Sequence, residues 1–235
     1  MFICRELIKA LKRESNENQI TEIKLCIESI FELNLKWNHL EEIKWNIFRD
    51  FTCLTSIELS WNSIRSIRNA VFNSLKNLQT LDLSWNDIDT IEPDAFKGLN
   101  SLRSLNLNNN RLHSLATQTF IEPNSLVELD LAKNFLSKLD QSIFKDLSNL
   151  ESLNLSKNKL KSIEPNHLKY LIHLKCIDLS KNYLRKLSSK CFRDLIYLLR
   201  VDLRENDLNV FSLMKLKYLN LNRIVLKNPK IVIDK

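Results

Sequence analysis

The sequence contains a single glycine, Gly98, and only four prolines among its 235 residues. Glycine-rich phosphate loops and dinucleotide-binding fingerprints need several glycines where the backbone approaches phosphate closely, so both kinds of nucleotide site are excluded. Tight two-residue hairpins that rely on glycine are not expected either. The scarcity of glycine therefore argues against a nucleotide-loop enzyme and against a fold built from short hairpins.

Long hydrophobic runs are also missing. No stretch approaches the roughly 20 apolar residues that a membrane-spanning helix needs. The apolar run at the N-terminus is broken by Arg5 and Glu6, so it has no signal-peptide core. As written, the chain is therefore expected to stay in the cytosol and to carry no membrane span.

The charge is strongly basic overall but evenly spread. The formal net charge is +7 and the isoelectric point is about 9.1. Lysine and arginine alternate with aspartate and glutamate along the whole chain, without a long basic run. This pattern favours a solvated surface of mixed charge over a nucleic-acid footprint, so nucleic acid is disfavoured as a partner.

Residues that could carry chemistry are few and scattered. The five cysteines form no CxxC pair and are Cys4, Cys26, Cys53, Cys176 and Cys191. No cysteine and histidine cluster has the spacing of a zinc site, and no histidine pairs in register with a nucleophile and a carboxylate. Free, reduced thiols are favoured, although a bridge between Cys4 and Cys26 stays open. The sequence predicts no catalytic residue, metal or cofactor.

What the sequence does have is a 24-residue repeat. Eight asparagines recur at this interval without a slip: Asn38, Asn62, Asn86, Asn110, Asn134, Asn158, Asn182 and Asn206. Around each of them the frame LxxLxLxxNxL recurs, as in "LQTLDLSWNDI" at 78–88, followed by a second half with further apolar positions. Eight aligned units at one fixed period are typical of a solenoid.

The frame itself predicts a sheet that is buried on one face only. Leu81 and Leu83 alternate with Thr80, Asp82 and Ser84, which is the period of a half-buried strand. Parallel sheets are normally covered on both faces, but in a solenoid the second half of each repeat covers one face and leaves the other open. Inward asparagines can then pair the backbone of each turn, so we interpret them as a structural ladder.

One position in the second half of the repeat is predicted to form a buried aromatic spine. Its occupants are Phe48, Phe72, Phe96, Phe120, Phe144 and Phe192, with Leu168 in the remaining full repeat.

The frame resembles the leucine-rich repeat family, specifically its 24-residue type with a phenylalanine in the second half. The resemblance is close from residue 30 to about 210. It implies an α/β repeat solenoid: a curved horseshoe with a parallel β-sheet on the concave face and irregular or short helical segments on the convex side. The type is familiar from Toll-like receptor ectodomains, Slit-like proteins and small proteoglycans, which implies an extracellular or cell-surface location.

The ends depart from the period. Residues 1–29 are expected to form a capping helix and an entry turn, and residues 30–210 to form eight repeats, the last one shortened. The frame that begins at Leu198 begins again at Leu216, well before a full period has passed, with Ile224 at the asparagine position. Residues 211–235 are therefore expected to be a degenerate terminal repeat or incomplete cap, whose uncovered edge invites self-association.

The concave face is the predicted binding site. Trp37, Trp61 and Trp85 occupy one equivalent position at the edge of the sheet, and Lys133, Lys157 and Lys181 occupy it in later repeats. Glu58 and Asp82 face solvent from the strands. Two alternatives stay open for each group: the tryptophans contact a ligand or stack on one another, and the lysines form an anion site or a solvated edge.

The predicted function is a non-enzymatic module that binds a protein ligand on the concave face, as part of a receptor or cell-surface ectodomain. The alternative is a complete cytosolic scaffold or regulatory subunit.

Overall fold

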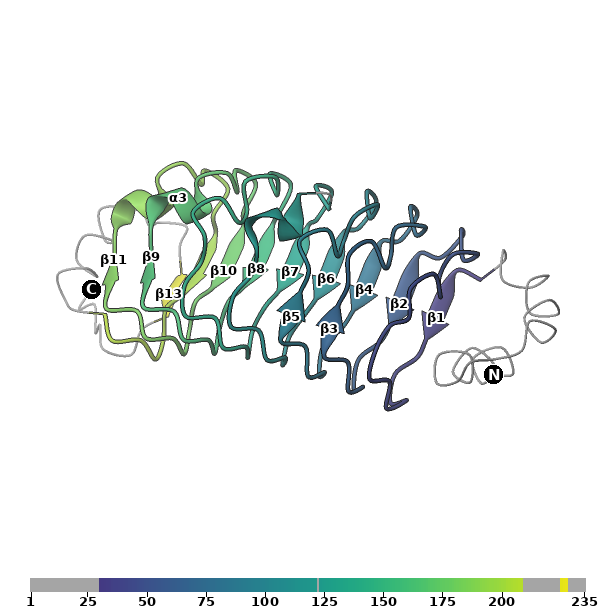
Figure 1. The fold of residues 1–235 in the computed structure, drawn as a ribbon. Coiled ribbons are helices and arrows are strands. Elements are labelled where there is room, and N and C mark those ends of the chain that lie inside the picture. The colour runs from purple at the N-terminus through teal and green to yellow at the C-terminus, as the bar shows by residue number, and fades with distance from the viewer. Residues whose placement is uncertain (1–29, 122, 209–224, 228–235) are drawn as a thin grey trace, which may run out of the picture.

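A computed structural model describes residues 30–121, 123–208 and 225–227 as an elongated solenoid (Figure 1). The N-terminal cap expected at 1–29 lies outside these residues. One parallel sheet runs along the whole array in the order β1-β2-β4-β6-β7-β8-β10-β12-β13. Its strands are β1 (Glu32–Asn34), β2 (Ser56–Glu58), β4 (Thr80–Asp82), β6 (Ser104–Asn106), β7 (Glu128–Asp130), β8 (Ser152–Asn154), β10 (Cys176–Asp178), β12 (Arg200–Asp202) and β13 (Val225–Lys227).

The strands are short because the alternating pattern soon gives way to a turn. In the large sheet, the middle residue of each three-residue strand up to β12 is buried, and its two neighbours are turned toward solvent in most of these strands. A side-chain hydrogen bond marks the end of the strand. In β4, the carboxylate of the last residue, Asp82, accepts a hydrogen bond from the backbone N–H of Ser84 at 2.8 Å. Asp130 and Asp178 bond the second residue after them in the same way, at 2.8 Å. Such local side-chain bonds compete with strand pairing and turn the chain out of the sheet.

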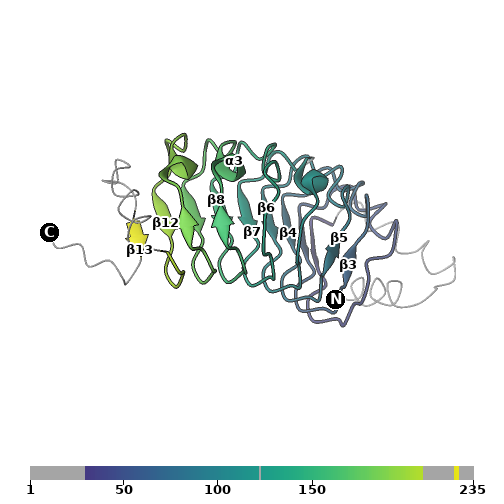
Figure 2. The ribbon, with the colours of Figure 1, turned by 60° about the vertical axis from the view of Figure 1, so that its left-hand side comes forward.

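The opposite side of the solenoid contains little helix (Figure 2). Together with the parallel sheet, this confirms the predicted fold class. The opposite side holds two small parallel sheets, β3 (Ser66–Ile67) with β5 (Thr90–Ile91) and β9 (Ser162–Ile163) with β11 (Lys186–Leu187). Its helical turns are η1 (Thr117–Phe120), α3 (Pro165–Leu168) and η2 (Ser189–Phe192). No helix within the described residues has both the length and the apolar character needed to cross a bilayer.

The predicted phenylalanine spine is confirmed. Its rings are at most 5% exposed, and Leu168 is fully buried in the same position. From Phe48 to Phe144, consecutive rings stack with their centroids 5.8 to 6.4 Å apart. The spine therefore fills the outer part of one continuous hydrophobic core.

The asparagines lie where each strand leaves the sheet. The amide oxygen of Asn134 accepts a hydrogen bond from the backbone N–H of Leu112, in the preceding turn, at 3.0 Å. Its Nδ2 donates to the carbonyls of Leu107, also in the preceding turn, and of Leu131 and Ala132. Asn86, Asn110, Asn158, Asn182 and Asn206 repeat this arrangement within a few tenths of an ångström.

The two asparagines at the start of the array differ from the rest. Asn62 accepts two backbone N–H groups of the first turn, those of Asn38 and Leu40. Asn38 donates within its own turn, to the carbonyl of Lys36 at 2.8 Å. Each asparagine from Asn62 onward thus satisfies backbone groups of two adjacent turns at once.

The last described strand does not coincide with the sequence frame. A frame that starts at Leu216 would put a strand at 218–220, which lies outside the described residues, and the structure pairs Val225–Lys227 with β12. Arg200 pairs with Val225, one position beyond the full period that separates the other partners of the sheet, such as Cys176 and Arg200. The physical reason is that one circuit of the solenoid needs about a full repeat of chain, and the interval from Leu198 to Leu216 falls well short of it.

Candidate functional site

The concave sheet presents a column of polar side chains at the last residue of each strand from β1 to β12. This strand-end column consists of Asn34, Glu58, Asp82, Asn106, Asp130, Asn154, Asp178 and Asp202. All of its side chains except that of Glu58 form a hydrogen bond within the chain, each accepting it from the backbone N–H of the second residue after it. The carboxylate of Glu58 makes no hydrogen bond or ion pair with any described residue.

Two carboxylates of this column have altered pKa values. Burial raises the pKa of Asp130, although hydrogen bonds from Ala132, Asn108 and Asn154 oppose the shift. For Asp202 burial also acts upward, but the guanidinium of Arg204, 2.6 Å away, outweighs it and lowers the pKa. Five of the eight residues in the column carry carboxyl groups, on a chain whose net charge is positive.

A second column follows three residues after each strand, at the edge where the strands end. All its members have a left-handed backbone, with φ between 52° and 61°: Trp37, Trp61, Trp85, Asn109, Lys133, Lys157, Lys181 and Glu205. This exit-edge column contains all six tryptophan and lysine residues that the sequence singled out. Asparagine tolerates this conformation, whereas other side chains pay about 1–2 kcal/mol for it. The hydrogen bonds between turns hold it, as where Trp61 N–H donates to the carbonyl of Ser84.

The three tryptophans form a continuous stack. The ring centroids of Trp37 and Trp61 are 4.2 Å apart, and those of Trp61 and Trp85 are 4.1 Å apart, with planes within 17° of parallel. At the far end the Nζ atom of Lys133 lies 4.9 Å from the centroid of Trp85. Of the two alternatives for the tryptophans, self-stacking is present. A ligand can still reach Trp37 and Trp85, which are 60% and 37% exposed.

The lysines of the exit-edge column are not equivalent. Lys133 lies over Trp85, and Lys181 forms an ion pair with Glu205 at 3.1 Å. Lys157 is exposed and pairs with no carboxylate of the described residues. The three lysines lie in one row, but Lys133 and Lys181 already contact other residues of the chain. The row therefore offers a ligand less positive charge than the sequence suggests.

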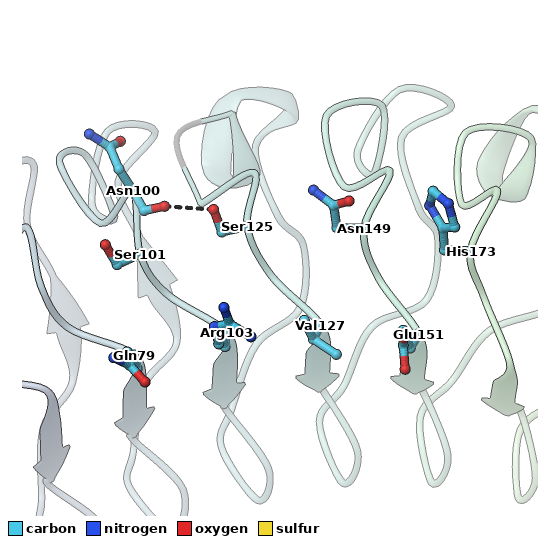
Figure 3. A pocket seen from close by; sticks show the side chains of 9 residues that line it. All are labelled: Gln79, Asn100, Ser101, Arg103, Ser125, Val127, Asn149, Glu151 and His173. Carbon is cyan, nitrogen blue, oxygen red and sulfur yellow. Dashed lines mark hydrogen bonds between the residues drawn. The ribbon is translucent and has the colours of Figure 1, made fainter.

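A groove at the opposite edge, where the strands begin, was not anticipated from the sequence (Figure 3). It has a volume of about 540 Å³ and is lined by Gln79, Asn100, Ser101, Arg103, Ser125, Val127, Asn149, Glu151 and His173. Ser125 and Asn149 donate to carbonyls of the preceding turn at 2.7 and 3.1 Å, which fixes the wall. Arg103 forms no ion pair with a described residue. The regular spacing of positions 101, 125, 149 and 173, one in each successive repeat, was the available signal.

Cys191 and His167 are buried titratable residues on the convex side. Burial raises the pKa of the Cys191 thiol to about 11, and its Sγ lies 3.2 Å from the carbonyl oxygen of Ile163. Cys53 and Cys176 are free as well. Within the described ranges, no group of three or more histidine, cysteine, aspartate or glutamate side chains is placed to hold a metal ion.

Comparisons with known proteins agree with this architecture. The family model described as "Leucine rich repeat" matches residues 54–112, 86–134 and 124–184, which together cover more than half of the chain. None of the curated proteins compared matches the chain. Among solved structures, one of TLR13 in complex with ssRNA13 has a TM-score of 0.74 and 32% identity, over 80% of this chain and 26% of that chain.

Two further structures have the same fold. Human 5T4, a trophoblast glycoprotein, has a TM-score of 0.66 and 25% identity, over 83% of this chain and 75% of that chain. Toll, from a Drosophila complex with Spatzle, has a TM-score of 0.68 and 23% identity, over 86% of this chain and 32% of that chain. The chain thus spans about a quarter of TLR13 and a third of Toll.

Proposed function

Because this chain belongs to the leucine-rich repeat family, we propose that it is a non-enzymatic interaction module that docks a protein ligand on its concave face. The leucine-rich repeat fold generally mediates protein–protein interaction. The observation that carries the proposal is the exit edge of the concave face. There a tryptophan stack with exposed ends lies beside a strand-end column in which the Glu58 carboxylate has no partner among the described residues.

The surface is preformed, which favours binding by shape. The asparagine bonds tie each turn to its neighbour, and the strands of the large sheet from β1 to β12 pair in one register. A ligand then meets side chains that are already positioned, so little conformational entropy is lost on binding. Tryptophan adds a large contact area with few rotatable bonds.

A protein ligand fits this face better than a nucleic acid does, although TLR13 was solved with ssRNA13. The strand-end column carries carboxylates, including Glu58, Asp82 and Asp178, which repel phosphate. Bases also bind single-stranded sites by stacking on open aromatic faces. No base can enter between Trp37 and Trp61 or between Trp61 and Trp85, because the centroids are 4.1 to 4.2 Å apart, so only the outer face of Trp37 is left for a base.

Site-specific photo-cross-linking tests the proposal directly. A photo-cross-linking amino acid would replace Thr80 or Glu128, which are exposed on the concave strands, in the protein expressed in cells. The matched control positions are Lys97 and Lys145, which are exposed on the convex side. We expect the same protein adduct from both concave positions and from neither control, identified by mass spectrometry. An adduct of RNA at the concave positions, or equal capture from both sides, would overturn the proposal.

We further propose that the module belongs to a receptor or cell-surface ectodomain, which the similarity to TLR13 supports. The alternative, a cytosolic scaffold, is supported by the free thiols of Cys53, Cys176 and Cys191. Thiol titration of the endogenous protein separates the two. Five reactive thiols after unfolding, one for each cysteine of the sequence, would favour the scaffold. A pair of protected cysteines would favour the ectodomain.

Self-association through the C-terminal edge also stays a proposal. β13 is the last strand of the sheet, and an open strand edge can pair with a second chain. Light scattering over a range of protein concentrations tests it: a mass that rises with concentration is expected, and a strict monomer at high concentration would contradict it.

A further inference from the structure

The two ends of the tryptophan stack differ in what covers them. Trp61 has an indole ring on each of its faces. Trp85 has Trp61 on one face and the ammonium group of Lys133 over the other, 4.9 Å from the centroid. Trp37 has Trp61 on one face, and no described aromatic ring or cation lies over the other; it is the most exposed of the three, at 60%. Within the described residues, the stack therefore ends in one capped face, on Trp85, and one open face, on Trp37.

The chain itself shows which chemistry an aromatic face accepts here. Besides Lys133 over Trp85, the Nζ of Lys159 lies 4.5 Å from the ring centroid of Phe135, and that of Lys169 lies 4.7 Å from that of Tyr170. An aromatic face carries the negative part of the ring quadrupole, and tryptophan attracts a cation most strongly. The open face of Trp37 therefore has the electrostatic character of the face that Lys133 covers.

We propose that the open face of Trp37 is a docking point for a lysine or arginine side chain of the protein ligand. The proposal rests on the proposed function and names one contact within it. Trp61 and Trp85 are positioning residues, because they hold the Trp37 ring in place and take no ligand between them. Inserting a planar group would require the centroids to separate to about 7 Å, well beyond 4.2 Å.

The neighbouring charge supports a cation over a neutral group. β1 pairs in register with β2, so that Asn34, three residues before Trp37, lies beside Glu58. The Glu58 carboxylate has no partner among the described residues. It adds a negative potential on the same face and at the same end of the array, which attracts a cation over several ångströms at low salt.

The test uses two fluorescein-labelled peptides as probes, an octapeptide of alternating lysine and glycine and its twin with every lysine acetylated. Acetylation removes the charge and keeps most of the shape. Fluorescence anisotropy would give the affinity of each for the full chain. We expect the wild type to prefer the lysine peptide, and Trp37→Leu to weaken that peptide alone by about three- to fivefold. Trp37→Phe, which keeps an aromatic face, should retain part of the preference.

Two controls separate the aromatic contact from other causes. Trp45→Leu makes the same change in the same repeat at a more exposed tryptophan, 71%, outside the stack, and should leave both affinities unchanged. Glu58→Gln should weaken the lysine peptide at low salt but not at about 0.5 M salt, where charge attraction is screened. The expected loss in Trp37→Leu persists at the higher salt.

Several outcomes would overturn the inference. They are the absence of any lysine preference in the wild type, an equal loss for both peptides in Trp37→Leu, and a lowered melting temperature with unchanged peptide affinities. Cross-linking from Thr80 and Glu128 reports on the proposed function separately. Protein capture there together with an inert Trp37 would leave the module intact and remove only this contact.

Discussion

The first three turns and the fifth to seventh turns use one backbone position in two different ways. In both regions the exit-edge column has the same left-handed φ, 54° to 61° at Trp37, Trp61 and Trp85 and 52° to 55° at Lys133, Lys157 and Lys181. In the first region the side chains bind one another; in the second they contact a ring, an ion-pair partner or solvent. The repeat therefore fixes the backbone at this position and leaves the side chain free to specify the surface.

Removing an asparagine of the ladder from each region should destabilise the protein most strongly, and it tests whether the backbone is the same in both regions. Asn86→Ala and Asn182→Ala each remove one acceptor and three donor contacts of matching length. Each leaves buried backbone groups unpaired, so each should lower the free energy of unfolding by about 3 kcal/mol or more. Urea denaturation of the two variants checks this. A difference of more than about 1 kcal/mol between them would show that the regions differ in their backbone as well.

A smaller loss is expected when the stack itself is broken. Trp61→Asn removes both ring contacts, each worth about 0.5–1.5 kcal/mol, and relieves part of the left-handed strain at that position. The net loss of stability should be about 1–2 kcal/mol, measured by the same denaturation. Unchanged stability would mean that the stack contributes nothing beyond covering its own surface.

Asparagine at the same position in the second region should increase stability instead of lowering it. Lys157 makes no ion pair with a described residue and sits at φ 55°, so Lys157→Asn relieves strain without losing a contact. We expect a gain of up to about 1 kcal/mol, read from the shift of the denaturation midpoint. A destabilised Lys157→Asn would reveal a contribution from the lysine that its contacts do not show.

The weakest predicted change in stability depends on pH and arises from His167, in the second region. Burial lowers the pKa of His167 despite the opposing influence of Glu164, the Leu139 carbonyl and Asp140. Its Nδ1 accepts the Glu164 N–H at 3.0 Å, which requires the neutral ring.

The sign follows from proton linkage. As pH falls below about 6.5, the unfolded chain binds the proton before the folded one does, so stability falls over this window. Melting temperatures between pH 7.5 and 5.5 should decline in the wild type and decline less in His167→Asn, which keeps an acceptor. Parallel profiles for the two proteins would exclude His167 as the cause.

The sequence was sufficient for the features that obey the period. The strand positions from β1 to β12 and the buried phenylalanines follow from apolar residues that recur once in every repeat, because each turn must bury the same side against its neighbours. The strand at 225–227 could not be predicted in this way, because the repeat frame fits the sequence from Leu216 better than it fits the residues that pair with β12. Periodicity locates elements reliably only while the period holds.

The candidate site was predictable in place but not in geometry. Equal spacing put Trp37, Trp61 and Trp85 side by side, yet it could not decide between stacked rings and rings open to a ligand. Nothing in tryptophan or lysine signals a left-handed backbone, which these residues rarely adopt. The groove at the edge where the strands begin was not predicted, because loops as well as strand starts line it. The apolar repeat pattern carries no information about those positions.

The phenylalanine spine has a mechanical consequence for recognition. On the outer side of the solenoid the rings are spaced 5.8 to 6.4 Å apart, whereas the tryptophan rings on the inner edge are 4.1 to 4.2 Å apart. The outer layer is therefore more widely spaced than the inner edge, as expected for a solenoid that curves around its concave sheet. We expect a smaller residue in the phenylalanine layer to reduce this curvature and so to change how large an object the concave face can hold.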